Sequence, residues 1–364
     1  AAGRPPGLRV TATRATPMLP FEIALIERLA AGLPRSPLQR NARHESDAEL
    51  LQLPGSDAVL ALTIDGIVEE IDRGLYTDPY LIGWMTVTAS ASDLAAVGAA
   101  PLGILVNVVL PPDLEAEGLT RLRQGIGDAC AAYELPVLGG DTNSGGRLQT
   151  AACAVGLIPD GAPLGRRGCA PGHRLYASGP LGLGAAFAIL QLGGGGPGAP
   201  PPCYQPRARL REGQLLRRVA SCAMDSSDGA LVTLDELMRL NGVGFRLEHR
   251  VEDILDPQAR QVAQSADLPP WMMLAGPHGE FELLFTVPTN RRADLLAGAR
   301  SLGWEPLDLG VVVSEPGLTL GPGGPAHLDT RRARDLFVET GGDVERYLGE
   351  LSRLAGGEAA SSIR

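Results

Sequence analysis

The chain has 364 residues, of which 44% are hydrophobic and 4% aromatic, so it can form two domains whose cores are built from Leu, Val, Ala and Ile. Its net charge of −10 argues against nucleic-acid binding, which would need a basic stripe. All 32 basic residues are arginine, which excludes a Schiff-base lysine and the lysine of a phosphate-binding P-loop.

Composition also bears on where the protein works. No apolar run has the length of a transmembrane helix, so we expect no membrane association. The five cysteines are scattered without a CxxC pair, which favours reduced thiols in a cytoplasmic protein over a zinc site or disulfide framework. Residues 1–20 are rich in arginine and lack the hydrophobic segment of a secretory signal, which indicates a flexible tail; a transit-like role is the alternative.

The first half of the chain predicts alternating helices and strands. Spacing of apolar residues indicates helices over 21–33, 78–98 and 115–135, and strands over 58–68, 102–111, 136–142 and 148–158. The strand 102–111 is apolar almost throughout, which is typical of a buried strand. The strand 136–142 is expected to end in a glycine turn, because it closes with "GGDT".

The second half begins with a strand, a Gly/Pro turn and a helix over 173–192. The stretch "GGGGPGAPPP" at 193–202 predicts a flexible loop or linker. Further on, we expect helices over 225–242 and 291–304, and strands over 243–248, 280–288 and 306–313. Because both halves mix strands and helices, we predict an α+β protein with domains at 21–165 and 166–340, followed by a C-terminal helix or tail over 341–364.

Six aspartates stand at junctions between predicted elements and have small or hydroxyl neighbours: Asp47, Asp65, Asp93, Asp141, Asp225 and Asp228. For any one of them, capping a helix or forming a turn is the simpler role. Six such residues without an obvious arginine partner in sequence suit a shared site, because Mg²⁺ prefers oxygen ligands. The pattern therefore predicts several Mg²⁺ ions that bridge nucleotide phosphates.

Other catalytic motifs are missing from the sequence. The five histidines are isolated, with no HExxH motif, and no GxSxG motif occurs. The stretch "LGGDTNSGG" at 138–146 offers backbone N–H groups that glycine would let approach a phosphate, although such glycine pairs also form ordinary turns.

Several stretches, taken together and in order, resemble the thiamine-monophosphate kinase family, within the aminoimidazole ribonucleotide synthetase-like superfamily. The most specific are "SDLAAVGA", "GGDT" and "DSSDG", supported by "TIDGIVE", "LGRRGCAPGH" and "FELLFTVP". The resemblance extends from about residue 21 to about residue 340. It implies a two-domain fold, with an N-terminal domain that forms a shared β-barrel at a homodimer interface and a C-terminal α/β domain.

The resemblance also implies the reaction and its site. ATP would bind in a cleft with several Mg²⁺ ions, and its γ-phosphoryl group would pass directly, in line, to a small-molecule acceptor. The implied metal ligands are Thr63, Asp65, Asp93, Asp141, Asp225 and Asp228. The implied nucleotide contacts are Asp47, Gly139, Gly140, Asp141, Arg166 and Ser227.

The departures from the family lie mostly on the acceptor side. The family's histidine falls on Asp72. Its Gly-Gly-Glu-Asp-Tyr-Glu motif appears here as "PHGEFE", so the first acid of the adjacent pair is lost at Gly279, while Glu280 and Glu282 remain. Thiamine phosphate carries its own ionised nucleophile, which a carboxylate would repel. We therefore hypothesise another acceptor, with a hydroxyl or amine, for which Asp72, Glu280 or Glu282 acts as base or binds a cation. The alternative is that Asp72 is a solvated loop residue.

Two other functions stay open at this level. A superfamily enzyme could use ATP to activate a carbonyl or amide oxygen for cyclisation or ligation. A nucleotide-binding partner protein without turnover is the third possibility, since Ser46 and Ile64 replace two oxygen ligands expected from the family.

Overall fold

The computed structural model describes residues 20–193, 202–276, 278–322, 324–325 and 328–355. The chain divides into two compact units, Ala1–Pro34 and Arg35–Arg364. The first unit contains the predicted helix α1 (Phe21–Ala30). The predicted tail up to residue 19, residues 194–201 of the predicted linker and residues 356–364 of the predicted C-terminal segment lie outside the described residues.

The second unit begins with a five-stranded sheet in the order β1-β2-β5-β3-β4. Its strands are β1 (Glu49–Gln52), β2 (Val59–Ile67), β3 (Ala100–Leu110), β4 (Val137–Ser144) and β5 (Gln149–Ile158). Strands β3 and β4 run parallel, and the other neighbours run antiparallel. Three helices belong to this part of the chain: α2 (Glu69–Asp72), α3 (Pro79–Ala96) and α4 (Ala116–Tyr133).

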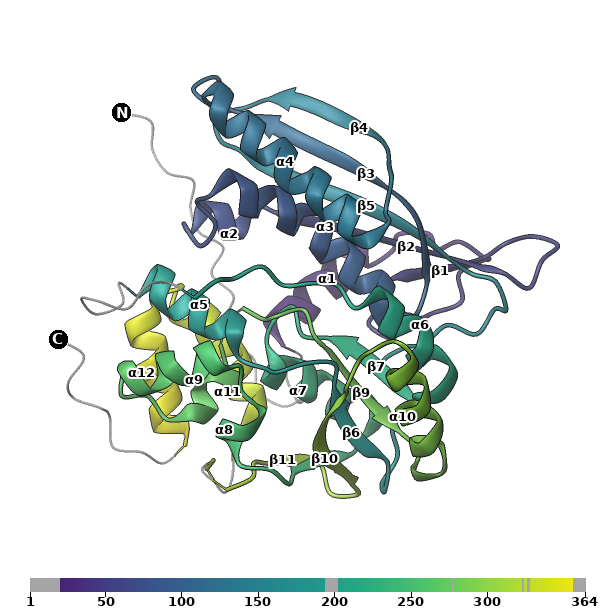
Figure 1. Cartoon of the computed structure of the whole chain (residues 1–364), viewed down its shortest axis with the longest axis vertical. Coiled ribbons are helices and arrows are strands. Elements are labelled where there is room, and N and C mark those ends of the chain that lie inside the picture. Colours follow the sequence, from purple (N-terminus) through teal and green to yellow (C-terminus); the bar gives the residue numbers. More distant parts are fainter. Residues whose placement is uncertain (1–19, 194–201, 277, 323, 326–327, 356–364) are drawn as a thin grey trace. The chain divides into compact units, whose positions relative to one another are not determined.

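Helices α3 and α4 lie side by side against this sheet (Figure 1). Asp78 caps α3 by accepting a hydrogen bond from the Tyr80 backbone N–H at 3.0 Å. The two helices cross at Gly83 and Gly125. A Cβ on Gly83 would lie 2.2 Å from a backbone oxygen of α4, and a Cβ on Gly125 would lie 2.0 Å from one of α3. Only glycine permits this close approach, which fixes where α3 lies.

A second sheet of six strands follows in the order β11-β8-β10-β6-β9-β7. Its strands are β6 (Arg174–Ala177), β7 (Cys222–Asp225), β8 (Gly244–Leu247), β9 (Leu283–Val287), β10 (Leu307–Val313) and β11 (Gly317–Thr319). The α-helices of this part are α5 (Leu183–Leu192), α6 (Leu210–Val219), α7 (Ala230–Asn241), α8 (Val251–Ile254), α9 (Pro257–Ser265), α10 (Arg292–Ser301), α11 (Thr330–Glu339) and α12 (Val344–Leu354). Two 3₁₀ helices, Pro270–Leu274 and Thr289–Arg291, complete it.

The buried side chains form two clusters that are rich in Leu, Ala and Val, as the low aromatic content predicted. One surrounds α3 and reaches the second sheet through Tyr176 and Phe285; the other lies between the second sheet and its helices. Helix α3 contacts β2 and β5 of the first sheet and β7 of the second. It therefore brings its side chains to the junction of the two sheets. The prediction of an α+β fold is confirmed.

The helices and strands predicted for residues 21–158 all have counterparts, but two details are wrong. Strand β3 is only partly buried, because Leu102 and Leu105 on its outer face are 46% and 42% exposed. The stretch "GGDT" lies inside β4 rather than in a turn. Elements that the sequence did not predict are β1, α2, α6, β7, α8, α9, β11 and α11. The sheets change between β5 and β6, near the predicted boundary at residue 165, which stays a prediction.

Candidate active site

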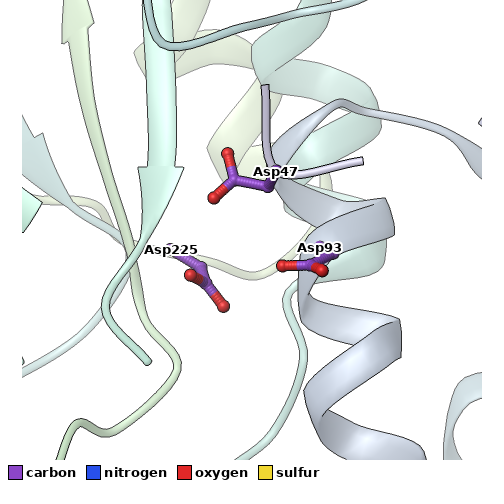
Figure 2. Close-up of side chains that lie close together, drawn as sticks. All are labelled: Asp47, Asp93 and Asp225. Carbon is purple, nitrogen blue, oxygen red and sulfur yellow. The ribbon is translucent and has the colours of Figure 1, made fainter. Parts of the chain in front are cut away.

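Three aspartates that are far apart in sequence converge at the junction of the two sheets. Asp47 precedes β1, Asp93 lies in the last turn of α3, and Asp225 ends β7. Each offers a carboxylate oxygen, and these oxygens all lie within 4.8 Å of one another. Figure 2 shows the three carboxylates pointing toward one another. We call Asp47, Asp93 and Asp225 the acid cluster.

Strand β2 adds Asp65 to this arrangement. Because side chains alternate along a strand, Thr63 and Asp65 face α3 while Ile64 points the other way and is 74% exposed. Thr63 Oγ1 hydrogen-bonds Asp93 and lies 3.4 Å from Asp65 Oδ2. Ser90 on α3 donates to Asp65 Oδ2 at 3.0 Å. The predicted residues Thr63, Asp65 and Asp93 are therefore brought together.

The turn between β7 and α7 holds the "DSSDG" motif. Ser227 Oγ donates to Asp225 Oδ1 at 3.0 Å, which orients that carboxylate. Asp228 is exposed, yet its charge contributes to the raised pKa of Asp65, for which burial is the main cause. The turn thus supplies two acids to one site, since Asp225 points into the cluster and Asp228 lies near Asp65.

The acids of the site resist ionising together. Burial raises the pKa of Asp93 well above its ordinary value, and the charges of Asp65, Asp225 and Asp47 raise it further. Burial, followed by the charge of Asp47, raises the pKa of Asp225 to about 7. Carboxylates that share a site in this way gain from a bound cation, which removes the repulsion between them.

Two carboxylate oxygens of the cluster are also unpaired. Asp47 Oδ2 and Asp225 Oδ2 are buried, and neither has a partner with hydrogen-bond geometry among the described residues, although the Ser92 hydroxyl lies close enough to Asp225 to lower its pKa. Buried polar atoms in proteins are almost always paired, so these oxygens call for a ligand. The other Asp47 oxygen accepts a hydrogen bond from Arg166 Nη2 at 3.0 Å. A donor set of carboxylates and hydroxyls fits a hard divalent cation such as Mg²⁺.

A pocket of about 260 Å³ is lined in part by Ser46 and Gly165. These residues directly precede Asp47 and Arg166 in sequence, so the pocket lies beside that ion pair. Its full lining is Arg40, Asn41, Glu45, Ser46, Leu50, Pro163, Leu164, Gly165 and Arg167. Polar and cationic side chains therefore border the acid cluster on this side.

Asp141 does not join the acid cluster within one chain. It lies on β4, and both β5 and β3 separate β4 from β2. Strand β3 packs Val106 on the core, so Leu105 and Asn107 face outward, and Asn107 pairs with Asp141. Asp141 therefore points to the face opposite α3, where it accepts a hydrogen bond from Asn143 at 2.8 Å.

Gly139 and Gly140 also lie on β4, and both are exposed. A Cβ on Gly140 would lie 1.8 Å from the Val106 backbone oxygen, so glycine is needed here for β4 to pair closely with β3. Packing explains this glycine without a phosphate.

The three acids predicted as acceptor-side bases have other partners. Asp72 forms an exposed ion pair with Arg147 at 3.1 Å. Glu280 is buried and accepts hydrogen bonds from Gly182 N at 2.8 Å and Ser226 Oγ at 3.1 Å. Glu282 is buried against Arg209 and also hydrogen-bonds Ser178. These contacts pair both carboxylates with donors of the chain itself, and burial raises the pKa of Glu280 to about 8. The assignment of the three acids as acceptor-side bases stays a prediction.

The sequence analysis did not assign roles to Ser90 and Glu70. Ser90 lies three residues before Asp93, so both are on one face of α3, and this spacing could have indicated it. Glu70 lies in α2, which was not predicted. Burial raises its pKa, and the charges of Glu69, Asp228 and Asp65 add to the effect.

Comparison with known proteins places this geometry in a family. The family described as AIR synthase related protein, N-terminal domain, matches residues 45–158. A thiamine-monophosphate kinase of Methanospirillum hungatei is 32% identical over 260 residues, which cover 71% of this chain and 84% of the relative. The thiamine-monophosphate kinase of Escherichia coli O157:H7 is 30% identical over 289 residues, which cover 78% of this chain and 87% of the relative.

The chain belongs to the thiamine-monophosphate kinase family. This confirms the resemblance drawn from the motifs, and with it the assignment to a family of ATP-dependent kinases. A solved structure, AaThiL complexed with AMPPCP and TMP, has the same fold, with a TM-score of 0.68 at 22% identity over 85% of this chain and 96% of that one. No helix in the described part of the chain has the length and apolar character needed to cross a membrane.

Proposed function

We propose that the chain is an ATP- and Mg²⁺-dependent phosphotransferase that passes the γ-phosphoryl group of ATP directly to a small-molecule acceptor. The observation that carries this proposal is the acid cluster, with its two buried and unpaired carboxylate oxygens. Structural aspartates in a protein interior are normally paired with a guanidinium or with backbone N–H groups. Here Arg166 contacts one oxygen of Asp47 and leaves the other for a cation.

Asp47, Asp93 and Asp225 would hold one Mg²⁺, and Asp65, Asp228 and the Thr63 hydroxyl would serve a further one. When bound, Mg²⁺ neutralises charge on the phosphates of the nucleotide. The chain itself supplies position: Ser90 and Ser227 orient two of the carboxylates, and Arg166 restrains Asp47. The pocket lined by Arg40 and Arg167 would accept part of the nucleotide beside the cluster.

We also propose that two copies of the chain associate through the outer face of the first sheet. Every residue of the edge strand β4 is exposed. The exposed apolar side chains of this sheet include Ile64 (74%), Leu105 (42%), Val137 (52%) and Leu138 (58%). Uncovered apolar faces and unpaired strand edges favour association. A second sheet placed there would give the shared barrel that the family resemblance implies. Asp141 lies on this face, so it would serve a nucleotide site only across such an interface.

The test of this function is turnover by purified protein. Mg²⁺-ATP is supplied with and without thiamine monophosphate, the acceptor named by the relatives, and ADP and the phosphorylated product are measured. We expect ADP formation that requires Mg²⁺ and is lost in Asp93→Asn. Release of free phosphate together with a new C–N bond would instead indicate a ligase or cyclase of the superfamily. Binding of ATP without turnover under any condition would indicate a non-catalytic partner protein.

A further inference from the structure

His278, Tyr76 and Tyr204 meet in the interior of the second unit, and the proposed function uses none of them. Their side chains are buried. The phenol oxygens of Tyr76 and Tyr204 lie 2.6 Å and 2.8 Å from His278 Nε2. The rings pack together as well, with the centroids of the two phenol rings 5.4 Å and 5.3 Å from that of the imidazole. We call these three residues the His278 network.

The hydrogen bonds of this network have a fixed direction. Tyr204 Oη lies 2.7 Å from the Gly279 carbonyl, which can only accept, so the phenol gives its proton to that carbonyl. The contact between Tyr204 Oη and His278 Nε2 then requires a hydrogen on Nε2, which the two phenol oxygens share. Burial lowers the pKa of His278 to about 3, so the ring is neutral near pH 7. The network therefore holds Gly279 through Tyr204.

Gly279 connects the network to the turn that carries Asp225 and Asp228. Its N–H donates to the Ser227 carbonyl at 2.9 Å. A Cβ on Gly279 would lie 1.4 Å from the Ser226 backbone oxygen, so the chain at this residue packs directly against the turn. Ser227 Oγ in turn donates to Asp225 Oδ1 at 3.0 Å. A shift of Gly279 would thus move the groups that orient the Asp225 carboxylate.

The network joins the two parts of the chain that supply the acids. Tyr76 lies between α2 and α3, and the last turn of α3 carries Asp93. Tyr204 and His278 belong to segments of the part that contains the second sheet, where Asp225 ends β7. A divalent cation binds well only when its oxygen ligands lie at suitable distances from one another. A contact between the two parts can therefore set how well the acid cluster holds a cation.

We propose that the His278 network positions the cation site. Through Gly279 it holds Asp225 and Asp228 at the separation from Asp93 at which one Mg²⁺ ion can bridge carboxylates of both parts. In this role the three residues of the network touch neither the ion nor the nucleotide. The proposal rests on the proposed function, because it concerns the same cation site, and it places no condition on the acceptor.

The experiment measures cation binding directly. Mn²⁺ is the probe, because it takes the same oxygen ligands as Mg²⁺ and its free concentration can be followed by electron paramagnetic resonance. Titrations are made with and without a non-hydrolysable ATP analogue. Tyr204→Phe and Tyr76→Phe each remove one hydroxyl group, His278→Leu removes the N–H donor, and His278→Gln keeps one. Urea denaturation gives the stability of each protein.

Tyr133→Phe is the matched control, because it also removes a buried phenol hydroxyl. Tyr133 Oη lies 2.9 Å from Thr88 Oγ1 and accepts a hydrogen bond from Ala208 N at 3.2 Å. These partners are outside the acid cluster and the turn after β7. The control therefore reports what the loss of a buried hydroxyl costs in stability, without a change at the cation site.

We expect Tyr204→Phe and His278→Leu to weaken Mn²⁺ binding about 10-fold or more, since loss of a group that holds a metal ligand in place typically costs about 10- to 100-fold. Tyr76→Phe should weaken binding less, because Tyr204 still holds Gly279. His278→Gln should bind Mn²⁺ better than His278→Leu, because the amide N–H can replace that of the ring. Tyr133→Phe should lose stability but keep the Mn²⁺ affinity of the wild type.

Two results would overturn the proposal and leave the network with a role in stability alone. One is an unchanged Mn²⁺ affinity in Tyr204→Phe and His278→Leu. The other is a loss of affinity in Tyr133→Phe as large as in these variants. A wild type that binds no Mn²⁺ under either condition would refute the cation site itself, and with it both the proposed function and this inference.

Discussion

Two of the groups of buried acids in the second unit differ in their partners. In the acid cluster, Asp47 and Asp225 each keep one buried oxygen without a hydrogen bond. Between α7 and α11, Asp235 and Glu236 are as deeply buried, but the Arg334 guanidinium lies 3.8 Å and 2.9 Å from their carboxylates. Burial of an acid therefore does not identify a functional site in this protein. A buried charge that lacks a partner calls for a ligand, so the unpaired oxygens of Asp47 and Asp225 make the acid cluster the better candidate site.

The largest effect should follow from neutralising a member of the acid cluster. Asp225→Asn removes the charge but keeps the size of the side chain, so we expect ATP turnover to fall by more than about 100-fold, since losing even an outer contact of a metal ligand costs 10- to 100-fold. The variant should fold, because one source of repulsion is gone. The effect is measured as the rate of ADP formation, and Mg²⁺-ATP binding is measured by calorimetry. Unchanged turnover would show that the cluster is only structural.

At the second group, Asp235 and Glu236 with Arg334, we expect a substitution to lower stability more than turnover. Arg334→Ala leaves Glu236, which is 1% exposed, without one of its two arginine partners. Removing one member of a buried ion pair costs about 3 kcal/mol or more of unfolding free energy. We expect this loss in urea denaturation. Because the Arg334 charge also acts on the Asp228 carboxyl and lowers its pKa, kcat per folded molecule should fall too, but by less than in Asp225→Asn. Arg332→Ala is the matched control, because its ion pair with Glu339 is exposed and should contribute less than about 1 kcal/mol.

The pH dependence of stability should distinguish the two regions when metal is removed. The pKa of Asp225 is about 7 in the folded chain against an ordinary 3.8, so the folded state holds more protons between these values. Its contribution to stability is therefore complete below about pH 4 and is lost as pH rises through 7. A shift of about three units corresponds to about 4 kcal/mol.

We accordingly expect the thermal midpoint in EDTA to fall between pH 5 and pH 8 in the wild type and to fall less in Asp225→Asn. Mg²⁺ added at pH 8 should recover most of the loss, because it replaces the proton as the partner of the carboxylates. A wild-type midpoint that is flat over this range, or indifferent to Mg²⁺, would contradict the interpretation of the cluster as a cation site.

The sequence predicted the site residues that lie on regular elements with clear periodicity. Thr63 and Asp65 are two apart on a predicted strand, so they had to share a face, and Asp93 falls on a predicted helix. The same rule failed for Asp141, because "GGDT" was taken for a turn. Because that stretch is part of strand β4, the alternation of side chains along the strand places Asp141 on the outer face of the sheet.

The acceptor side was harder to predict because its contacts are long-range. Nothing near Glu282 in sequence announces Arg209, which lies 73 residues away. Residues 69–72 form a helical turn that no periodic pattern marks. The side of this short helix that carries Asp72 could therefore not be predicted from the sequence.

The smallest effect is expected at Asp72 itself. Its ion pair with Arg147 is 40% exposed on the acid side and 70% on the arginine side, so solvent screens the attraction. Asp72→Asn should change the unfolding free energy by less than about 1 kcal/mol and leave ADP formation unaltered. Urea denaturation and steady-state kinetics test both statements. A large loss of kcat in Asp72→Asn, with normal stability, would restore Asp72 as the acceptor-side acid.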